Sequence, residues 1–252
     1  MTSVPFLSVI VPAYNEHARI GETLRELKQV LAGSSVSWEV RVVNDGSTDD
    51  TAGLVEGAAG ANGHVVLQSE PHRGKGAAVK AGMLASQADL RFMCDADLSM
   101  PPREIRRFIE AVPGRCDIAI ASRELPGSIR IDEPPYRHWM GRGFNWLVRL
   151  TTLPGISDTQ CGFKMFSAAA AEAVFPRVTT DGWAFDIEVL GLARQMGLRV
   201  LEIPVEWHYG AVSRVSPVRD TVGMTRELWA IRRRLRSNHH GQHTRTRARH
   251  IR

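Results

Sequence analysis

Cysteine is scarce in this chain of 252 residues. The three cysteines, Cys94, Cys116 and Cys161, are odd in number and far apart. Such a set provides neither a disulfide framework nor the paired spacing of a zinc site. Because nothing here depends on disulfides, we expect the protein to reside in the reducing cytoplasm.

Long hydrophobic runs are also lacking. No window reaches the roughly 18 apolar residues that a helix needs to cross a bilayer. The N-terminus has no basic stretch followed by an apolar segment, so we expect no secretory signal. With 43% hydrophobic and 23% charged residues, the composition is typical of a globular protein, and the length favours one large domain or one domain with appendages.

Lysine is rare, with 4 lysines against 28 arginines, and the basic charge gathers at the C-terminus. Residues 226–252 hold nine arginines and one acid, a net charge of +8, whereas the other 225 residues hold 23 basic and 26 acidic groups, a net charge of −3. Residues 237–252 show no apolar periodicity, which predicts a disordered basic tail. The folded domain is therefore expected over residues 1–236.

Short apolar runs alternate with helical patterns along the first half of the chain. The runs that favour strands lie at residues 7–11, 39–43, 65–67, 90–94 and 117–121. Helical spacing favours helices at residues 16–32, near 49–59, 74–88 and 103–112. Repeated βα units predict an α/β fold with a doubly wound, mostly parallel sheet. Patterns in the second half favour helices at 136–153, 167–175, 184–196 and 218–236 and a strand at 200–205.

Polar residues follow three of these strands at the point where each strand ends. The first strand runs into Pro12–Glu16, the second into Asn44–Asp49, and the fourth into Asp95 and Asp97. Each segment alone is compatible with an ordinary loop or a helix cap. Ligands of open α/β sheets bind at the carboxyl ends of the strands, so three such ends indicate one polar site at this edge.

Asp95 and Asp97 form the most informative pair. Two carboxylates at i and i+2 of an extended chain point to the same side, with their α-carbons about 7 Å apart. They repel each other unless a cation lies between them. Mg²⁺ or Mn²⁺ suits this pair, because a few carboxylates hold such an ion while substrate phosphates complete its shell. Ser99 would add an oxygen ligand or cap the following helix; a solvated loop is the alternative for the whole segment.

Two further features suit an anionic ligand. In Arg73-Gly74-Lys75-Gly76, the glycines allow close approach of the backbone, and the N-terminus of the next helix favours anions. The segment is not a Walker P-loop, and a simple turn is the alternative. Arg123 follows the fifth strand and offers a planar fork for phosphate oxygens or, alternatively, a surface ion pair.

These segments together resemble the family 2 glycosyltransferases of GT-A fold, over about residues 7–215. The resemblance implies a nucleotide-sugar donor and places the nucleotide-sugar half in residues 1–123 and the acceptor- and membrane-facing half in residues 124–236. The implied roles are nucleoside contacts from Pro12, Tyr14, Glu16 and Asp45, further donor contacts from Lys75, Asp95 and Arg214, metal ligation by Asp95, Asp97 and Ser99, and catalytic roles for Asp97, Arg123 and Asp186.

Within that family, the second half resembles the enzymes that glycosylate polyprenyl or dolichyl phosphate, both glucosyl- and mannosyltransferases. The resemblance lies in Asp158–Lys164, Trp183–Glu188, Glu206–His208 and Ser213–Val215. Arg214 stands where those proteins usually carry lysine, which keeps the charge but can change the geometry at the donor phosphate. The resemblance implies UDP-glucose as the donor, with GDP-mannose second.

A lipid phosphate as acceptor changes what catalysis requires. Its second pKa lies near 6, so it is largely ionised at pH 7 and attacks without a strong general base, whereas a hydroxyl acceptor needs one. Asp186 and Glu188 therefore need not be bases; Asp186 would border the acceptor site and Glu188 would be structural. Attack opposite the leaving diphosphate inverts the anomeric centre. The candidates for holding the acceptor phosphate are Arg130, Arg137 and Lys164.

A polyprenyl tail requires a membrane surface. The predicted helix at 136–153 mixes Trp139, Phe144 and Trp146 with Arg137, Arg142 and Arg149, which suits a helix lying in the interface; alternatively, the aromatic side chains fill the core. The basic tail suits anionic lipid, at up to roughly 1 kcal/mol per basic residue. We expect a cytoplasmic enzyme peripheral to the inner face of the membrane, with a membrane protein as a potential partner.

The sequence thus predicts a metal-dependent inverting hexosyltransferase. A soluble acceptor, such as a sugar or phosphoglycerate, is the alternative within this class. The arginine tail also fits nucleic acid, a partner that we do not expect. A module that binds nucleotide without turnover is the third possibility.

Overall fold

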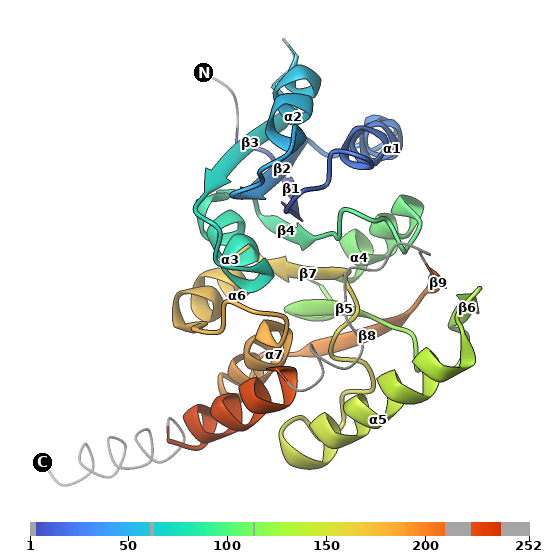
Figure 1. The fold of residues 1–252 in the computed structure, drawn as a ribbon, viewed down its shortest axis with the longest axis vertical. Coiled ribbons are helices and arrows are strands. Elements are labelled where there is room, and N and C mark those ends of the chain that lie inside the picture. Colours follow the sequence, from blue (N-terminus) through green and yellow to red (C-terminus); the bar gives the residue numbers. More distant parts are fainter. Residues whose placement is uncertain (1–3, 61–62, 113, 210–222, 238–252) are drawn as a thin grey trace, which may run out of the picture.

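The computed structural model describes residues 4–60, 63–112, 114–209 and 223–237. A sheet of seven strands runs through the described part in the order β3-β2-β1-β4-β7-β5-β8 (Figure 1). The strands are β1 (Leu7–Ala13), β2 (Trp38–Asp45), β3 (Val65–Glu70), β4 (Leu90–Met93), β5 (Ile118–Ser122), β7 (Lys164–Ser167) and β8 (Val200–Pro204). A second, two-stranded sheet pairs β6 (Ile129–Ile131) with β9 (Glu206–His208).

The main sheet confirms the predicted α/β class, since all of its strand pairs are parallel except those of β7. β7 lies antiparallel between β4 and β5. The sequence did not predict β7, β6 or β9. β6 and β9 have only three residues each, too few for a periodic pattern, and the four residues of β7 begin with a lysine and lack an apolar run such as Phe92–Cys94, which marks the end of β4.

Helices cover both faces of the sheet (Figure 1). The helices are α1 (Ile20–Ala32), α2 (Thr51–Ala59), α3 (Lys75–Ala85), α4 (Ile105–Ala111), α5 (Pro135–Thr151), α6 (Ala168–Val174) and α7 (Phe185–Gln195), with short 3-10 turns η1 (Pro102–Glu104) and η2 (Phe175–Arg177). Residues 223–237 are also helical. The core on one face takes residues from α1, α2 and α4, and the core on the other takes residues from α3, α6, α7 and the 223–237 helix.

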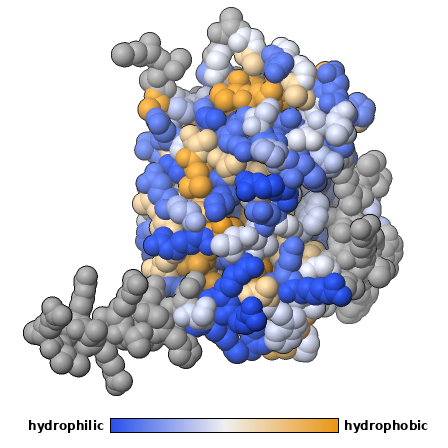
Figure 2. Space-filling model, turned by 60° about the vertical axis from the view of Figure 1, so that its left-hand side comes forward, coloured by the Kyte–Doolittle hydropathy of each residue, from blue (hydrophilic) through white to orange (hydrophobic). Residues whose placement is uncertain are grey.

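Alternation along β1 explains the two cores. Val9 and Val11 belong to one cluster and Ile10 to the other, because successive side chains of a strand point to opposite faces. On the side of the molecule drawn in Figure 2, hydrophobic residues lie in patches among hydrophilic ones. Of the helices that the structure describes, none has the length and apolar character to cross a membrane.

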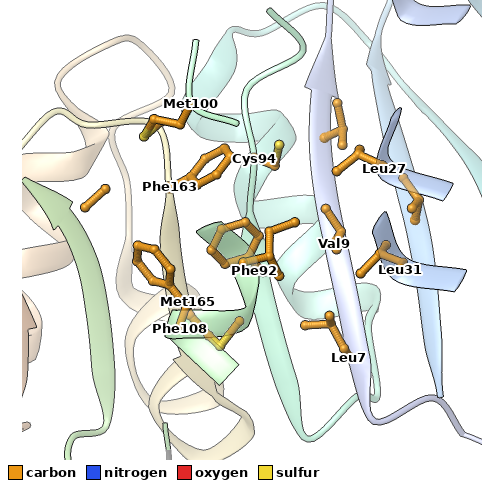
Figure 3. Packing of buried hydrophobic residues seen from close by; sticks show 14 of the residues in the cluster. Leu7, Val9, Leu27, Leu31, Phe92, Cys94, Met100, Phe108, Phe163 and Met165 are labelled. Atoms are coloured by element: carbon orange, nitrogen blue, oxygen red, sulfur yellow. The ribbon is translucent and has the colours of Figure 1, made fainter. Parts of the chain in front are cut away.

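Three aromatic rings fix the middle of the sheet. Phe92 of β4, Phe108 of α4 and Phe163 before β7 meet edge to face, with centroid separations of 5.4 Å, 5.0 Å and 6.3 Å (Figure 3). All three are fully buried. This cluster ties the end of β4 to the segment entering β7, and Asp95 follows directly after that end.

Candidate active site

The loops after β1 and β2 are bonded to each other. Asn15 donates its backbone N–H to Ser47 Oγ at 2.9 Å and accepts from the backbone N–H of Thr48 at 2.7 Å. Asn15 has a positive φ of 53°, a conformation that asparagine adopts more readily than most residues. Pro12, Tyr14 and Glu16 are therefore held beside the β2 loop, half-buried, and their contact with a nucleoside stays a prediction.

Asp45 anchors the loop that follows β3. Its buried carboxylate accepts from the backbone N–H groups of Arg73 at 3.0 Å and Gly74 at 2.9 Å, and it pairs with His72 Nδ1 at 2.8 Å. The His72 ring stacks on Tyr14 with centroids 4.0 Å apart. Both oxygens of Asp45 thus already have donors, which favours a structural role for Asp45 over the predicted nucleoside contact.

The Asp95 and Asp97 pair lies at the end of β4. Asp95 is half-buried and Asp97 is exposed. The residue between Asp97 and Ser99, Leu98, has a φ of 45°, a conformation that costs free energy in a bulky residue and is typical of functional loops. The pKa of Asp97 is raised, first by desolvation in its surroundings and second by the charge of Asp95, although its surface remains accessible.

Ser99 supports Asp97 directly. Its backbone N–H donates to Asp97 Oδ1 at 3.0 Å, and its carbonyl accepts from the N–H of His208 at 2.7 Å. The alternative in which Ser99 caps the next helix is wrong, because η1 begins after Pro101 and has no side-chain cap. A role for Ser99 as a metal ligand stays a prediction.

Lys75 brings a positive charge to this pair. It is the first residue of α3, and its Nζ lies 2.6 Å from Asp95 Oδ1. Burial opposes the charge, but Asp95 and then Asp186 outweigh it, so the pKa of Lys75 is raised and the ammonium stays charged. The glycine-rich segment is thus more than a simple turn, since it delivers a cation to the end of β4.

The segment that leads into β7 packs against Asp95. A Cβ added at Gly162 would lie 2.2 Å from Asp95 Oδ2, so only glycine leaves room for this carboxylate. Lys164 is 1% exposed and donates to Asp186 Oδ1 at 2.6 Å and to the Cys161 carbonyl at 2.7 Å. The prediction that Lys164 holds an acceptor phosphate is therefore wrong, because its ammonium is buried and used within the protein.

Asp186 is buried as the partner of Lys164. Burial raises the pKa of Asp186, and the charges of Lys164 and then Lys75 oppose that rise. Glu188, two residues later, accepts from the backbone N–H groups of Thr179 at 2.9 Å and Thr180 at 2.7 Å. The structure therefore supports the prediction that Glu188 is structural. Asp186 interacts electrostatically with Lys75.

Arg123 forms a bidentate ion pair with the buried carboxylate of Asp158. Its Nε and Nη2 donate to Asp158 Oδ2 at 2.7 Å and Oδ1 at 3.0 Å. Asp158 is 0% exposed; burial raises its pKa, but Arg123 outweighs this and lowers the value to about 2. The fork predicted for phosphate thus serves Asp158, and Arg130 likewise pairs with Glu124 and Glu133. Arg214 and the side chain of Arg137 lie outside what the structure describes.

The carboxylate pair fits a divalent cation. Asp95 and Asp97 supply two hard oxygen donors whose mutual repulsion contributes to the raised pKa of Asp97, and a cation would relieve that repulsion. Across the described ranges, no cluster of three or more histidine, cysteine or acidic residues could hold a metal. Two carboxylates are nevertheless enough for an ion of the Mg²⁺ type, because substrate phosphates and water complete its shell.

Two residues without a predicted role, His72 and Trp183, also lie at this site. His72 stacks on Tyr14 and bonds to Asp45. Its position shortly after the third strand could have indicated this role, because the other site residues also follow the ends of strands. Trp183 is 41% exposed, and the Lys75 ammonium lies 5.4 Å from the centroid of its ring. Tertiary contact, not spacing, brings both residues to the site.

The sequence is similar to those of known proteins. The family model "Glycosyl transferase family 2" matches residues 8–175. Dolichyl-phosphate beta-glucosyltransferase ALG5C of Trichomonas vaginalis is 36% identical over 81% of this chain and 64% of its own length. The Dictyostelium discoideum and Saccharomyces cerevisiae dolichyl-phosphate beta-glucosyltransferases are 34% and 32% identical over 90% of this chain and 74% of theirs. The chain thus spans slightly less than two thirds of the Trichomonas relative.

Solved structures share the fold. Glucosyl-3-phosphoglycerate synthase from Mycobacterium tuberculosis in complex with UDP matches with a TM-score of 0.66 and 17% identity, over 92% of this chain and 80% of that one. The same enzyme with Mn²⁺, UDP-glucose and glycerol 3-phosphate matches with a TM-score of 0.65 and 17% identity, over 90% and 78%. At this identity the likeness establishes the fold alone.

Proposed function

Because the chain belongs to glycosyl transferase family 2, we propose that it transfers glucose from UDP-glucose to a polyprenyl phosphate and inverts the anomeric centre. One observation supports this most: at the carboxyl end of β4, beside the loops of β1 and β2, Asp95 pairs with the Lys75 ammonium and Asp97 adds a second carboxylate. A nucleotide sugar needs such a mixture of charges for its diphosphate. GDP-mannose is the alternative donor.

The metal belongs to this proposal. Asp95 and Asp97, with Ser99 as a third candidate, would hold Mg²⁺ or Mn²⁺, which supplies Lewis-acid stabilisation to the leaving diphosphate. Mn²⁺ in the similar synthase structures supports a divalent ion. Lys75 keeps Asp95 oriented and its charge balanced. Catalysis by these residues consists of positioning and electrostatic stabilisation, because the ionised acceptor phosphate needs no strong base.

The names of the relatives support the acceptor class. Dolichyl phosphate is an anion on a long apolar tail, so its phosphate reaches the enzyme at a membrane surface. α5 offers a suitable face: Trp146 and Leu150 are 64% and 63% exposed, and Arg142 and Arg149 are exposed beside them. A helix with large apolar residues between arginines suits an anionic membrane interface. We place the protein peripherally at the inner face, with a membrane protein as a potential further anchor.

Turnover tests the proposal directly. Radiolabelled UDP-glucose or GDP-mannose would be incubated with Mg²⁺ or Mn²⁺ and with polyprenyl phosphate, 3-phosphoglycerate or no acceptor. We expect organic-extractable label from UDP-glucose and polyprenyl phosphate alone, and about 10³-fold less from Asp97→Asn. Label in a water-soluble product would overturn the lipid acceptor. No transfer from any donor, despite nucleotide binding, would support the binding module instead.

A further inference from the structure

We propose that Trp183 is the platform for the hexose of the donor, so that its indole contacts the transferred sugar while Lys75 and the acidic pair serve the diphosphate. This rests on the proposed function. The ammonium of Lys75 contacts two groups at once. Its Nζ lies 2.6 Å from Asp95 Oδ1 and 5.4 Å from the centroid of the Trp183 ring.

A single ammonium group therefore separates the indole from the carboxylate at the diphosphate end. In a nucleotide sugar the hexose is bonded directly to the terminal phosphate. The indole of Trp183 lies beside the same Lys75 ammonium that pairs with Asp95. If the diphosphate binds at Asp95 and Lys75, the attached hexose lies next to the indole. Trp183 is 41% exposed, so a large part of the side chain remains open to a ligand.

The chemistry of the indole suits this position. An aromatic face carries partial negative charge and attracts the polarised C–H groups on the apolar face of a hexose, as it attracts the Lys75 ammonium. Ligand sites typically combine such an apolar wall with a few fixed polar groups. Asp95 and Lys75 provide polar groups here, and Trp183 provides the wall.

The segment that carries the indole is fixed at several points. Gly76 donates its N–H to the Asp181 carbonyl at 2.8 Å, and the N–H of Ala184 donates to Glu227 Oε2 at 3.1 Å. Thr180 donates to Glu188 at 2.7 Å. Residues 180–184 are therefore bonded to α3, to α7 and to the 223–237 helix.

Close packing adds to this rigidity. A Cβ at Gly74 would lie 2.6 Å from the Asp181 carbonyl, and one at Gly76 would lie 2.5 Å from the Thr180 carbonyl. On the other side, a Cβ at Gly182 would lie 2.4 Å from Glu227 Oε1. An exposed aromatic side chain on so constrained a backbone is a preorganised contact surface, because little entropy is lost when a ligand binds it.

Comparison of two ligands isolates the sugar contact. Isothermal titration calorimetry with Mn²⁺ would give Kd values for UDP and UDP-glucose with the wild-type chain and with Trp183→Ala, Trp183→Phe and Trp229→Ala. Trp229, which is 53% exposed on the 223–237 helix, is the matched control. We expect Trp183→Ala to weaken UDP-glucose about tenfold and UDP less than twofold, Trp183→Phe to retain most affinity, and Trp229→Ala to change neither.

Other outcomes overturn the inference. Equal weakening of UDP and UDP-glucose would mean that Trp183 acts on the diphosphate through Lys75. Unchanged Kd values with a raised KM for the lipid acceptor would place the indole at the isoprenoid. If thermal unfolding shows that Trp183→Ala is destabilised by more than about 5 °C, Trp183→Leu replaces it, since it keeps apolar bulk without a π face.

The wild-type titrations keep this inference separate from the proposed function. If the wild-type chain binds GDP-mannose and not UDP-glucose, the same comparison is made with GDP and GDP-mannose, and the donor assignment alone has failed. If it binds no nucleotide sugar, the proposed function fails and the platform fails with it. If it binds UDP-glucose and Trp183→Ala binds equally well, only the platform fails.

Discussion

Lys75, the first residue of α3, and Asp95, in the loop after β4, meet with 2.6 Å between Nζ and Oδ1. The N-terminus of α3 supplies the cation, and the segment after β4 supplies the carboxylate. Lys75 neutralises the charge of Asp95, so the net charge of Asp95, Asp97 and Lys75 together is −1 and not the −2 of the two aspartates alone. The ion pair is thus part of the site and not a surface contact.

Removal of Lys75 tests that role. Lys75→Met leaves Asp95 without its cation and removes a positive charge from the diphosphate position, so we expect kcat/KM to fall by about two orders of magnitude. Steady-state kinetics with the labelled donor gives this value. Lys28→Met, at an exposed lysine of α1, is the control and should keep full activity. A Lys75→Met enzyme as active as Lys28→Met would contradict the assignment.

We expect the carboxylate of Asp97 to lower the stability of the fold while it contributes to activity. Its raised pKa means that the folded state disfavours its charge, first through desolvation and then through Asp95. We therefore expect Asp97→Asn, measured without metal at pH 7, to unfold at the wild-type temperature or a few degrees higher, while activity falls about 10³-fold. Differential scanning calorimetry and turnover provide the two measurements. A marked loss of stability would show that Asp97 is structural.

Asp158 predicts how stability depends on pH. Its pKa is about 2 in the folded chain against an ordinary value of 3.8, so its pairing with Arg123 stabilises the fold fully above about pH 4. This contribution, about 2 kcal/mol, should be lost as the pH falls from about 4 to 2. Urea denaturation at pH 6, 4 and 2.5 measures it. A free energy of unfolding that stays constant across this range would be inconsistent with the buried pair.

Gly162 tests the close approach to Asp95. A Cβ there would lie 2.2 Å from Asp95 Oδ2, so Gly162→Ala must displace the carboxylate or the backbone. We expect at least a tenfold loss in apparent Mn²⁺ affinity of the enzyme–donor complex, measured by calorimetry. Gly57→Ala in α2, where no atom lies within 4 Å, is the matched control and should stabilise the helix by about 0.5–1 kcal/mol. Equal metal affinity in both variants would refute the argument.

The exposed face of α5 predicts membrane binding. Trp146→Ser combined with Leu150→Ser removes two large apolar side chains from that face, so we expect several-fold weaker sedimentation with vesicles that contain phosphatidylglycerol. Leu84→Ser, at an exposed leucine of α3, should bind as the wild type does. Donor binding in solution should stay unchanged in all three proteins. Sedimentation that does not respond to the α5 changes would place the membrane contact elsewhere.

The sequence predicted the fold, and the edge of the sheet where the candidate site lies, because both depend on local signals. Apolar runs that end in polar residues located β1, β2 and β4 and, with them, Asp45, Asp95 and Asp97. It failed where a role depends on a distant partner. Lys164 and Arg123 have the chemistry of phosphate ligands, but Asp186 and Asp158 occupy them, and no spacing reveals those pairs. Trp183 likewise acquires its position only when the chain folds.

The position of β5 between β7 and β8 bears on how this protein is synthesised. Within the described sheet, β5 has two neighbours, β7 and β8, and both are translated after it. A nascent chain that has emerged only as far as Ser122 therefore carries β5 without a strand to pair with, and it lacks the glycine against which Asp95 packs. We expect the carboxyl-end edge of the sheet, where Asp95 lies, to fold completely only once about residue 204 has left the ribosome. Until then, chaperones would bind a partly folded chain with exposed hydrophobic surface.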